Sequence, residues 1–351
     1  MRIASDRQLA KGIKILKGAK SVSGVIVFSI MKDEIFFVRA FFDHYRKLGV
    51  DGFLVLDDGS SDGTLEFLLA QRDTTVLTSD FAYGEEYSRR AKIPWRYQTM
   101  RAGIRLKSII PDRFLRGQWC VYADADEFLV IPPQFNFIRD FTKELDARGM
   151  PLILGSVIEF YPHDFPDLSK STNEPSDLPD LLSKSPFFDS VKLFNVSDKG
   201  EIIRLCRSAS GRLFSTYGVP YGSSQEVATV EEVGASKNGK NLAIGSAIHK
   251  IPLIHPSRSV RLKSGHFATV QPSSIGAVAV LHFKFTFDIV RRTRLALESK
   301  AWSRGSAKYS NYQVLLSRME EANGTFLGPD SVIYEKPQQL VDVGNIWWNV
   351  S

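Results

Sequence analysis

The most constraining feature of this sequence is a regular alternation of strand-like and helix-like segments over residues 1–130. Short runs of β-branched and aromatic residues are each followed by a stretch in which apolar residues recur every three or four positions. We expect strands at 23–30, 52–56, 74–78 and 118–123, and helices at 33–48, from Thr64, and at 87–110 with a break at Pro94 left open. This alternation favours an α/β fold with a mostly parallel central sheet and flanking helices.

The pattern after residue 130 is less regular. We expect strands at 151–161, around 191–194, around 202–205 and at 277–285, and helices at 287–302 and 308–321. Residues 162–186 are rich in Pro, Asp and Ser and are expected to form a long surface loop.

The charge of the chain is concentrated at its beginning. Forty-five Lys and Arg residues face 39 Asp and Glu residues, which gives a formal net charge of +6. Residues 1–20 alone carry six basic residues and one acid, so the other 331 residues carry a net charge of only +1. A nucleic-acid-binding protein usually has a basic face across a domain, and we therefore expect no nucleic-acid partner.

The basic segment, residues 1–20, has the pattern of an amphipathic helix of about three turns. Basic side chains would lie on one side of this helix and apolar side chains on the other (Arg7, Lys11 and Lys14 against Leu9, Ile13 and Leu16). Such a helix can lie on an anionic membrane surface, or it can pack against the rest of the protein. Both interpretations stay open at this point.

The cysteines and the hydropathy pattern indicate the compartment. Cys120 and Cys206 show no CxxC or Cys/His zinc spacing, which favours buried thiols in a reducing compartment. No apolar run approaches the roughly 18–20 residues of a membrane span, and residues 1–20 lack the apolar stretch of a secretory signal. We therefore expect a cytoplasmic protein.

An acid-rich turn, Asp-Asp-Gly-Ser-Ser-Asp-Gly-Thr, occupies residues 57–64 directly after the second expected strand. Ligands of open α/β sheets bind outside the carboxyl ends of strands. There, Asp57, Asp58 and Asp62 could accept hydrogen bonds from a base or from ribose hydroxyls. The same composition also forms tight turns and helix caps for local reasons.

A second acidic segment, Asp124-Ala125-Asp126-Glu127, follows the apolar strand at 118–123. Two carboxylates at positions i and i+2 of a strand end can chelate Mg²⁺ or Mn²⁺, which then bridges to phosphate oxygens. A strand-terminating acidic turn is the alternative. Three acids in four positions favour the metal site.

His282 and Lys284 lie two residues apart in an apolar strand, so their side chains share one face of it. A metal-bound diphosphate would satisfy both, the imidazole through the metal and the ammonium through phosphate. A hydrogen-bonded core histidine is the alternative for His282. His266 in Ser-Gly-His-Phe is a weaker form of the same signal, and the remaining histidines are interpreted as structural (His44, His163, His249 and His255).

The order of these motifs resembles the nucleotide-sugar-binding half of a GT-A glycosyltransferase of the family 2-like group. Within that group the chain is most similar to the non-processive bacterial branch related to glycosyltransferase family 92. DDGSSDGT followed by DADEF carries most of the resemblance. Residues 31–56, Ile251-Pro252-Leu253, Ser264-Gly265-His266 and residues 281–285 also match, and the similarity covers about residues 22–320.

The resemblance implies a GT-A-like α/β fold with a C-terminal helical extension. The expected parts are a basic arm at 1–21, a catalytic domain at 22–285 and a helical region at 286–351. The nucleotide-sugar half of the catalytic domain would cover about 22–130, and the acceptor half about 131–285.

The resemblance also implies roles for individual residues. Asp33, Glu34, Asp57, Asp58, Asp62, Asp124 and His266 would bind the donor, and Asp124, Asp126 and His282 would bind Mn²⁺ or Mg²⁺. Lys284 would stabilise charge on the departing diphosphate. Asp189 and Glu159 are the candidates for the base that an inverting enzyme needs, and each also has a structural interpretation.

The implied activity is transfer of a sugar from a nucleotide-diphosphate sugar, with a UDP-sugar favoured, to a glycan or lipid-linked acceptor in surface polysaccharide biosynthesis. Lys32-Asp33-Glu34 stands where the family usually has Arg-Asn-Glu, a departure that bears on base binding. The sequence has no QxxRW-like motif and no apolar run of membrane-span length, which argues against a processive synthase. The basic segment could hold the enzyme at the inner face of the cytoplasmic membrane.

Two alternatives remain. A sugar-phosphate nucleotidyltransferase would carry a Gly-rich basic loop where this chain has Asp33 and Glu34. A non-catalytic nucleotide- or glycan-binding protein would not need acids at all three expected places.

Overall fold

The computed structural model describes residues 2–3, 5–19, 23–90, 97–170, 173–205, 208–219, 227–229, 248–299 and 307–349. The chain folds into two compact units that interleave along the sequence. The first unit contains residues 1–125, 137–152 and 251–270, and the second contains residues 126–136, 153–250 and 271–351.

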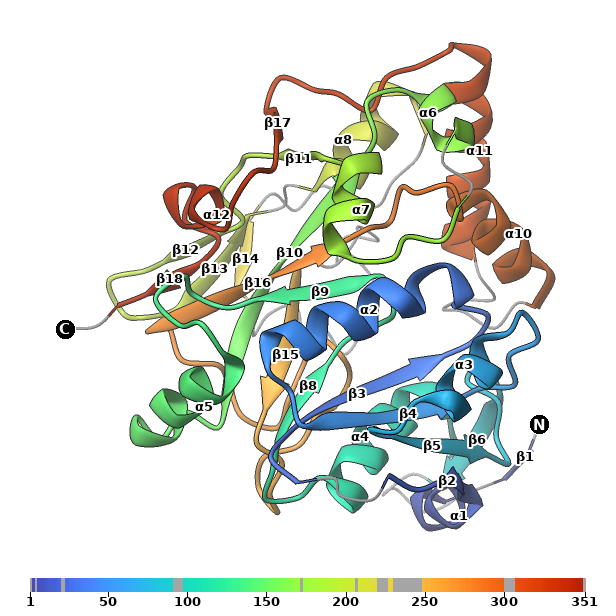
Figure 1. The fold of residues 1–351 in the computed structure, drawn as a ribbon, viewed down its shortest axis with the longest axis vertical. Coiled ribbons are helices and arrows are strands. Elements are labelled where there is room, and N and C mark those ends of the chain that lie inside the picture. The colour runs from blue at the N-terminus through green and yellow to red at the C-terminus, as the bar shows by residue number, and fades with distance from the viewer. Residues whose placement is uncertain are drawn as a thin grey trace. The chain divides into compact units, whose positions relative to one another are not determined.

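The sheet of the first unit has the strand order β15-β8-β3-β4-β5-β2 (Figure 1). These strands are β2 Ile13–Lys17, β3 Val25–Met31, β4 Gly52–Asp57, β5 Thr74–Ser79, β8 Trp119–Tyr122 and β15 His249–Ile254, of which residues 251–254 belong to this unit. The four central strands are parallel, whereas β2 and β15 pair antiparallel with β5 and β8. The α/β class and the mostly parallel central sheet are confirmed.

Helices cover both faces of this sheet. They are α1 Asp6–Gly12, α2 Ile35–Leu48, α3 Thr64–Ala70, α4 Ala102–Phe114 and α5 Ile138–Ala147. Phe42 of α2 stacks on Phe53 of β4 with ring centroids 4.1 Å apart, whereas Leu106 of α4 is buried in one cluster with Leu54. Because successive side chains of a strand point to opposite faces, α2 and α4 cover opposite faces of the sheet.

In the second unit, the strand order is β17-β11-β10-β16, and β16 also pairs with β9 and β18. Their bounds are β9 Glu127–Val130, β10 Leu152–Tyr161, β11 Phe187–Asp189, β16 Gly276–His282, β17 Ser331–Ile333 and β18 Trp347–Trp348. A separate small sheet contains β12 Phe194–Val196, β13 Ile202–Leu205 and β14 Val227–Thr229. The helices are α6 Phe165–Lys170, α7 Leu178–Lys184, α8 Ala209–Thr216, α10 Ile289–Ser299, α11 Ala307–Glu321 and α12 Gln338–Asp342.

The expected helix at 87–110 is wrong in its first half. The chain there forms β6 Glu86–Arg90 and β7 Tyr97–Arg101, which pair antiparallel, and β6 also pairs with β1 Arg2–Ile3. The helix begins only at Ala102. Inter-strand hydrogen bonds outweighed the local helical spacing, because intrinsic helix propensity is a weak preference. Pro94 lies outside the described residues.

The basic segment does not form a three-turn helix. Helix α1 begins after Ser5, which forms a capping box with Gln8, and ends at Gly12. Strand β2 follows directly and adds to the sheet beside β5. Leu9 and Ile13 are buried in the core of the first unit, whereas Ile15 and Leu16 are exposed. Lys14 forms an ion pair with Asp80 at 2.6 Å, so the segment is an integral part of this unit.

The expected loop at 162–186 also contains regular structure. Helix α6 lies within it, and α7 begins after Asp177, whose side chain accepts a hydrogen bond from the backbone N–H of Asp180 at 2.9 Å. An aspartate cap followed by Pro in the first turn is a local helix-start signal. The Pro, Asp and Ser content of the whole segment had favoured a loop instead.

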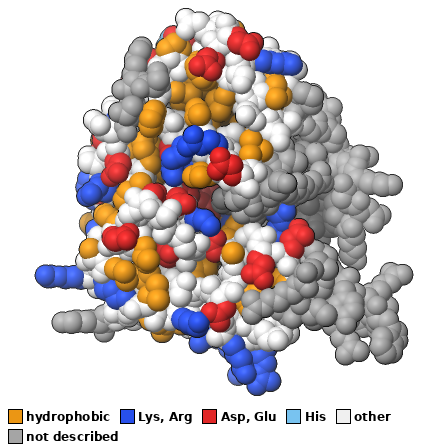
Figure 2. Space-filling model, turned by 90° about the vertical axis from the view of Figure 1, so that its right-hand side faces the viewer, with side chains coloured by type: hydrophobic (Ala, Val, Ile, Leu, Met, Phe, Trp, Pro, Cys, Tyr) orange, Lys and Arg blue, Asp and Glu red, His pale blue; other side chains and the backbone are white. Residues whose placement is uncertain are grey.

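Cys120 is buried as expected, and burial raises the pKa of its thiol. Cys206 lies outside the described residues. Within the described parts of the chain, no helix combines the length and the hydropathy needed to cross a membrane. On the face shown in Figure 2, basic and acidic side chains are interspersed among the described residues, in line with the small net charge after residue 20.

Candidate functional site

The polar residues that follow β3, β4 and β8 share one edge of the first unit, because these three strands are parallel and adjacent. We call this the carboxyl-end edge. It receives Lys32–Glu34 after β3, Asp57–Asp58 at the end of β4, and Asp124 after β8. Along the chain, β4 and β5 are added in turn on one side of β3, and β8 is then added on the other side of β3. Ligands of open α/β sheets bind at such a switch point.

Asp33 and Asp62 fix the shape of the turn at 57–64. Asp33 has a left-handed backbone conformation with φ of 54°, and its Oδ1 accepts a hydrogen bond from Ser61 N at 2.6 Å. Asp62 Oδ2 accepts from Ile35 N at 3.0 Å, and its Oδ1 accepts from Thr64 N at 3.0 Å. Asp62 therefore ties this turn to the start of α2, which is a structural role.

Asp57 is only 2% exposed, and one of its oxygens is not satisfied by any described residue. Its Oδ2 accepts from Gly59 N at 3.0 Å and from Ser60 N at 3.2 Å. Its Oδ1 is buried with no hydrogen-bond partner among the described residues. A buried acceptor without a donor is costly, so Asp57 Oδ1 is a place for a donor group of a ligand or for water.

Asp58 has an unusual proton affinity. Its Oδ1 accepts from Tyr83 N at 2.7 Å. Burial raises the pKa of Asp58 to about 6, with Asp57 adding to the rise, whereas the hydrogen bond and Lys32 oppose it. The carboxyl group of Asp58 therefore changes its charge in the range where many enzymes work.

Asp124 is held by two groups of the same unit. Tyr122 Oη donates to Asp124 Oδ1 at 2.7 Å, and Lys107 Nζ lies 3.6 Å from the same oxygen. The Lys107 ammonium also lies over the rings of Tyr83 and Tyr122, at 5.4 and 5.0 Å from their centroids. Burial would lower the pKa of Lys107, but Asp124 and the two tyrosines raise it well above its ordinary value. Asp124 remains 43% exposed and is accessible to a ligand.

The segment Ser264-Gly265-His266 lies beside Tyr122. A Cβ at Gly265 would lie 2.6 Å from Tyr122 Cε1, so only glycine fits this close approach. His266 N donates to Ser264 Oγ at 3.2 Å. The structure thus brings the predicted His266 segment against the residue that holds Asp124.

The second unit contains its own cluster of charged side chains, which we call the ion-pair cluster. It joins Asp126, Glu159, His282, Lys284 and Arg292. In the sheet, His282 pairs in register with Glu127 on one side and with Glu159 on the other. Glu127 itself forms a buried ion pair with Lys250.

Asp126 contacts two side chains that can carry positive charge. Its Oδ2 accepts from Arg292 Nη1 at 2.6 Å and lies 3.3 Å from His282 Nε2. Burial would raise the pKa of Asp126, but His282 and Arg292 lower it far below its ordinary range. Asp126 is therefore ionised, and its partner Arg292 was not predicted from the sequence.

Glu159 is engaged by Lys284 and by Ser210 at the start of α8. Its Oε1 lies 2.9 Å from Lys284 Nζ and accepts from Ser210 Oγ at 2.7 Å, and its Oε2 accepts from Ser210 N at 2.6 Å. Lys284 Nζ also lies over the ring of Tyr312, 4.9 Å from its centroid. Burial would raise the pKa of Glu159, but these partners and His282 lower it well below its ordinary range.

Asp189, the other predicted base, receives a two-pronged contact from Arg212. Arg212 Nε donates to Asp189 Oδ2 at 2.9 Å, and Nη2 donates to Oδ1 at 2.8 Å. Tyr161 Oη donates to Oδ1 as well. These contacts give Asp189 a structural role at the β11 strand, and its role as a base stays a prediction.

Asp126 and His282 fit a divalent cation in part. Their ligand atoms lie 3.3 Å apart, which is close to the spacing of two ligands on one octahedral ion with bonds of about 2.1 Å. The carboxylate suits Mg²⁺ or Mn²⁺, whereas an imidazole is more typical of softer divalent ions. However, the guanidinium of Arg292 is bound to the same Asp126 oxygen, so a metal ion would compete with Arg292. Asp124, the third predicted ligand, belongs to the first unit.

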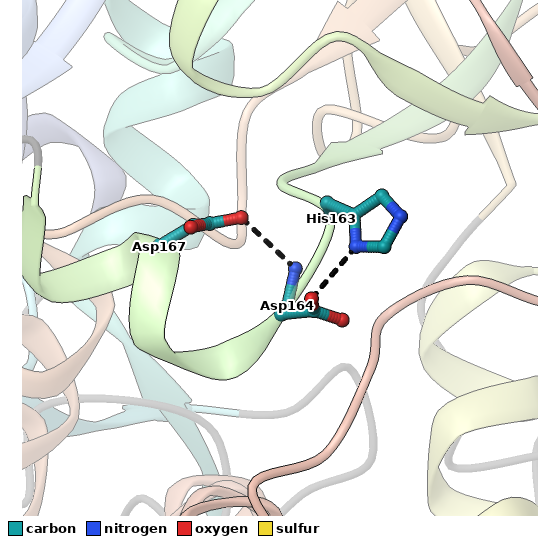
Figure 3. Close-up of side chains that lie close together, drawn as sticks. All are labelled: His163, Asp164 and Asp167. Carbon is teal, nitrogen blue, oxygen red and sulfur yellow. Dashed lines mark hydrogen bonds and ion pairs between the residues drawn. The ribbon is translucent and has the colours of Figure 1, made fainter.

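Another group of possible ligands was not predicted from the sequence. His163, Asp164 and Asp167 place their ligand atoms within 4.8 Å of one another at the start of α6 (Figure 3). His163 Nδ1 lies 2.8 Å from Asp164 Oδ2, and Asp167 Oδ2 accepts from the backbone N–H of Asp164. Figure 3 shows the imidazole and the Asp167 carboxylate on opposite sides of Asp164. Local hydrogen bonds account for the geometry of this group, in which His163 is exposed and the two aspartates are half-buried.

Comparison with known proteins assigns the chain to no family. No protein-family model matches the chain, and a search of the curated proteins finds no match. The function is therefore argued from the carboxyl-end edge and the ion-pair cluster.

Proposed function

We propose that this protein is a metal-dependent glycosyltransferase, which moves a sugar from a nucleoside-diphosphate donor to a hydroxyl group of an acceptor. The observation that carries the proposal is the set of acids at the carboxyl-end edge, on both sides of the switch point between β3 and β8. The resemblance of DDGSSDGT and DADEF to GT-A enzymes supports the same activity.

The carboxyl-end edge has the chemistry to bind a nucleoside. Asp57 Oδ1 is a buried acceptor without a donor among the described residues, and Asp58 and Asp124 are partly exposed carboxylates. Ribose hydroxyls and the N–H of a base are neutral donors that suit such acceptors. Lys107 keeps one positive charge beside Asp124. A UDP-sugar remains the favoured donor.

The ion-pair cluster has the chemistry to stabilise a leaving diphosphate. Asp126 and His282 would hold Mn²⁺ or Mg²⁺, and the bound metal would supply Lewis-acid stabilisation of the diphosphate charge. Lys284 adds a cation fixed by its contact with Glu159, and Arg292, displaced by the metal from the shared Asp126 oxygen, adds a second. Cations held in place before the reaction stabilise developing negative charge without reorganisation.

A base for the acceptor hydroxyl stays a prediction. Glu159 and Asp189 are both paired with cations, Lys284 and Arg212. Each carboxylate would have to give up its cation before it could take a proton efficiently, because a good base has a pKa near the working pH. Inversion, a non-processive mode and a glycan or lipid-linked acceptor of a surface polysaccharide remain part of the proposal.

We propose that the protein is located at the inner face of the cytoplasmic membrane. Ile15 and Leu16 of β2 are 58% and 49% exposed, and Arg7 and Lys11 are exposed close to them in sequence. Apolar and basic side chains together favour an anionic bilayer surface. Because α1 and β2 belong to the first unit, Ile15→Ser/Leu16→Ser is a better test than deletion. Unchanged co-sedimentation of this variant with anionic vesicles would refute the membrane contact.

The activity can be tested by thermal unfolding of the full chain with UDP, GDP or CDP, each with and without Mn²⁺. Binding to the folded state stabilises it by about 2.7 kcal/mol at a ligand concentration of about 100 Kd. We expect the melting temperature to rise for one base only, and the Mn²⁺-dependent part of the rise to be absent in Asp126→Asn. Asp140→Asn, an exposed acid on α5, is the matched control and should respond like the unchanged protein. No shift with any nucleotide, together with no nucleotide release from any nucleotide sugar, would reject the proposal.

A further inference from the structure

The first unit contains a cavity away from the acids of the carboxyl-end edge. Its volume is about 540 Å³, and its walls come from α1, from one side of α4 with the residues after it, and from the segment 251–270. We call it the arginine cavity, because five of its ten lining residues are arginines. These are Arg7, Arg105, Arg113, Arg116 and Arg261.

The spacing on α4 explains why these side chains meet. Arg105, Ile109 and Asp112 are separated by three or four positions, which places them on one face of α4, and Arg113 lies four positions after Ile109. Lys107 lies two positions from Arg105 and contacts Tyr122 and Asp124 instead. Helix α4 therefore presents different faces to the arginine cavity and to Asp124.

Two of the arginines are neutralised by acids of the cavity wall. Arg105 Nη2 lies 2.7 Å from Asp6 Oδ2, and Arg116 Nη2 lies 2.8 Å from Asp112 Oδ1. Asp6 and Asp112 are the two acidic residues of the lining. The ion pairs leave the charges of the other three arginines uncompensated.

Those three guanidinium groups have no acidic partner among the described residues. Arg113 Nη1 donates to the carbonyl oxygen of Ala10, which is a neutral group. The side chains of Arg7 and Arg261 are exposed and have no ion pair or hydrogen bond to any described residue. Like charges around one cavity repel each other, and a bound anion would remove that repulsion.

We propose that the arginine cavity binds a ligand with a phosphate or diphosphate group, either a soluble molecule or the headgroup of a lipid. Arginine presents a planar fork of donors that matches phosphate oxygens, and three uncompensated forks suit a multiply charged anion. A volume of about 540 Å³ is larger than one phosphate requires and falls in the range of sites for small molecules. This site is separate from the proposed donor site and does not depend on it.

The first arm of the test uses inorganic pyrophosphate, titrated into the full chain by calorimetry in the presence of a chelator. The chelator removes metal-dependent binding at the predicted metal ligands. Arg7→Gln and Arg261→Gln should each weaken binding roughly tenfold, because a hydrogen bond to a charged group typically has that effect. Arg72→Gln removes an exposed arginine outside the lining and should leave the affinity unchanged.

The second arm uses phosphatidylcholine vesicles with and without phosphatidic acid. Sedimentation with phosphatidic acid that is lost in Arg7→Gln/Arg261→Gln and kept in Arg72→Gln supports the site with a lipid phosphate as its ligand. Pyrophosphate binding without vesicle binding supports a soluble ligand. The side chains of Arg7 and Arg261 make no ion pair or hydrogen bond to a described residue, and an unchanged melting temperature will verify that the variants fold. The proposal is overturned if neither probe binds, or if Arg72→Gln weakens binding as much as the cavity variants do.

Discussion

The carboxyl-end edge and the ion-pair cluster hold their carboxylates in different ways. At the edge, Asp57, Asp58 and Asp62 accept hydrogen bonds mainly from backbone N–H groups. In the cluster, Asp126 and Glu159 face the charged side chains of Arg292 and Lys284. An amide can replace a carboxylate that accepts from the backbone, whereas it leaves a buried cation without its partner charge. The edge suits neutral donors of a ligand, and the cluster suits ionic chemistry.

The largest expected difference in the free energy of unfolding is between substitutions at the two acids of the predicted Asp-x-Asp pair, Asp124 and Asp126. Asp126→Asn leaves Arg292 and His282 beside a neutral amide in a buried place, although Arg292 keeps its 3.5 Å contact with Asp288, and loss of one partner of a buried pair costs up to about 3–5 kcal/mol. Asp124→Asn should cost less, because Asp124 is 43% exposed and its partner Lys107 also lies over the rings of Tyr83 and Tyr122. Urea unfolding of both variants measures the difference, and equal losses would contradict the contrast between the two regions.

Glu159 should make the stability of the folded protein decline at acid pH. The pKa of Glu159 is lowered from its ordinary value of 4.5. Its charge therefore contributes stability above about pH 4.5, and this contribution is lost as the pH falls further. Glu159→Gln should lose about 3 kcal/mol at pH 7 and show a flatter decline of stability below pH 4.5. Parallel acid-limb slopes for variant and unchanged protein would show that Lys284 does not stabilise this carboxylate.

The contribution of Asp58 to stability should depend on pH in the opposite direction and to a smaller extent. Its pKa is raised from 3.8 to about 6, so the folded state keeps a proton that the unfolded state has lost. The contribution of Asp58 to stability therefore falls as the pH rises from about 4 to 6. Asp58→Asn keeps an acceptor for Tyr83 N and carries no charge. The melting temperature of this variant should therefore rise relative to that of the unchanged protein over this pH range. A constant difference between pH 4 and 7 would argue against the raised pKa.

Local sequence signals predicted the parts of the fold that are set by local periodicity. The strands β3, β4, β5 and β8 each appear as an apolar run followed by a turn, and the acids after them could be placed at one edge from topology alone. Strands β6 and β7 could not be predicted in this way, because their stability comes from pairing with each other and with β1.

The partners of the predicted site residues were harder to find. Lys107, Ser210 and Arg292 come from helices far from the acids in sequence, and nothing in their own neighbourhoods marks them as functional. Lys107 carries a weak signal, since it lies between the apolar Leu106 and Ile110 of α4. The arginine cavity has the same origin, because three separate stretches of chain supply its cations.

The antiparallel strand β2 has a consequence for how this chain can be handled. It is the last strand on its side of the first unit's sheet, and it covers the backbone of β5 from Val76 to Ser79. Without β2, the N–H and C=O groups of β5 would form an open edge of a sheet rich in β-branched residues. Such an edge pairs readily with a second chain and promotes aggregation. A protein shortened at its N-terminus should therefore lose solubility before it loses any chemistry.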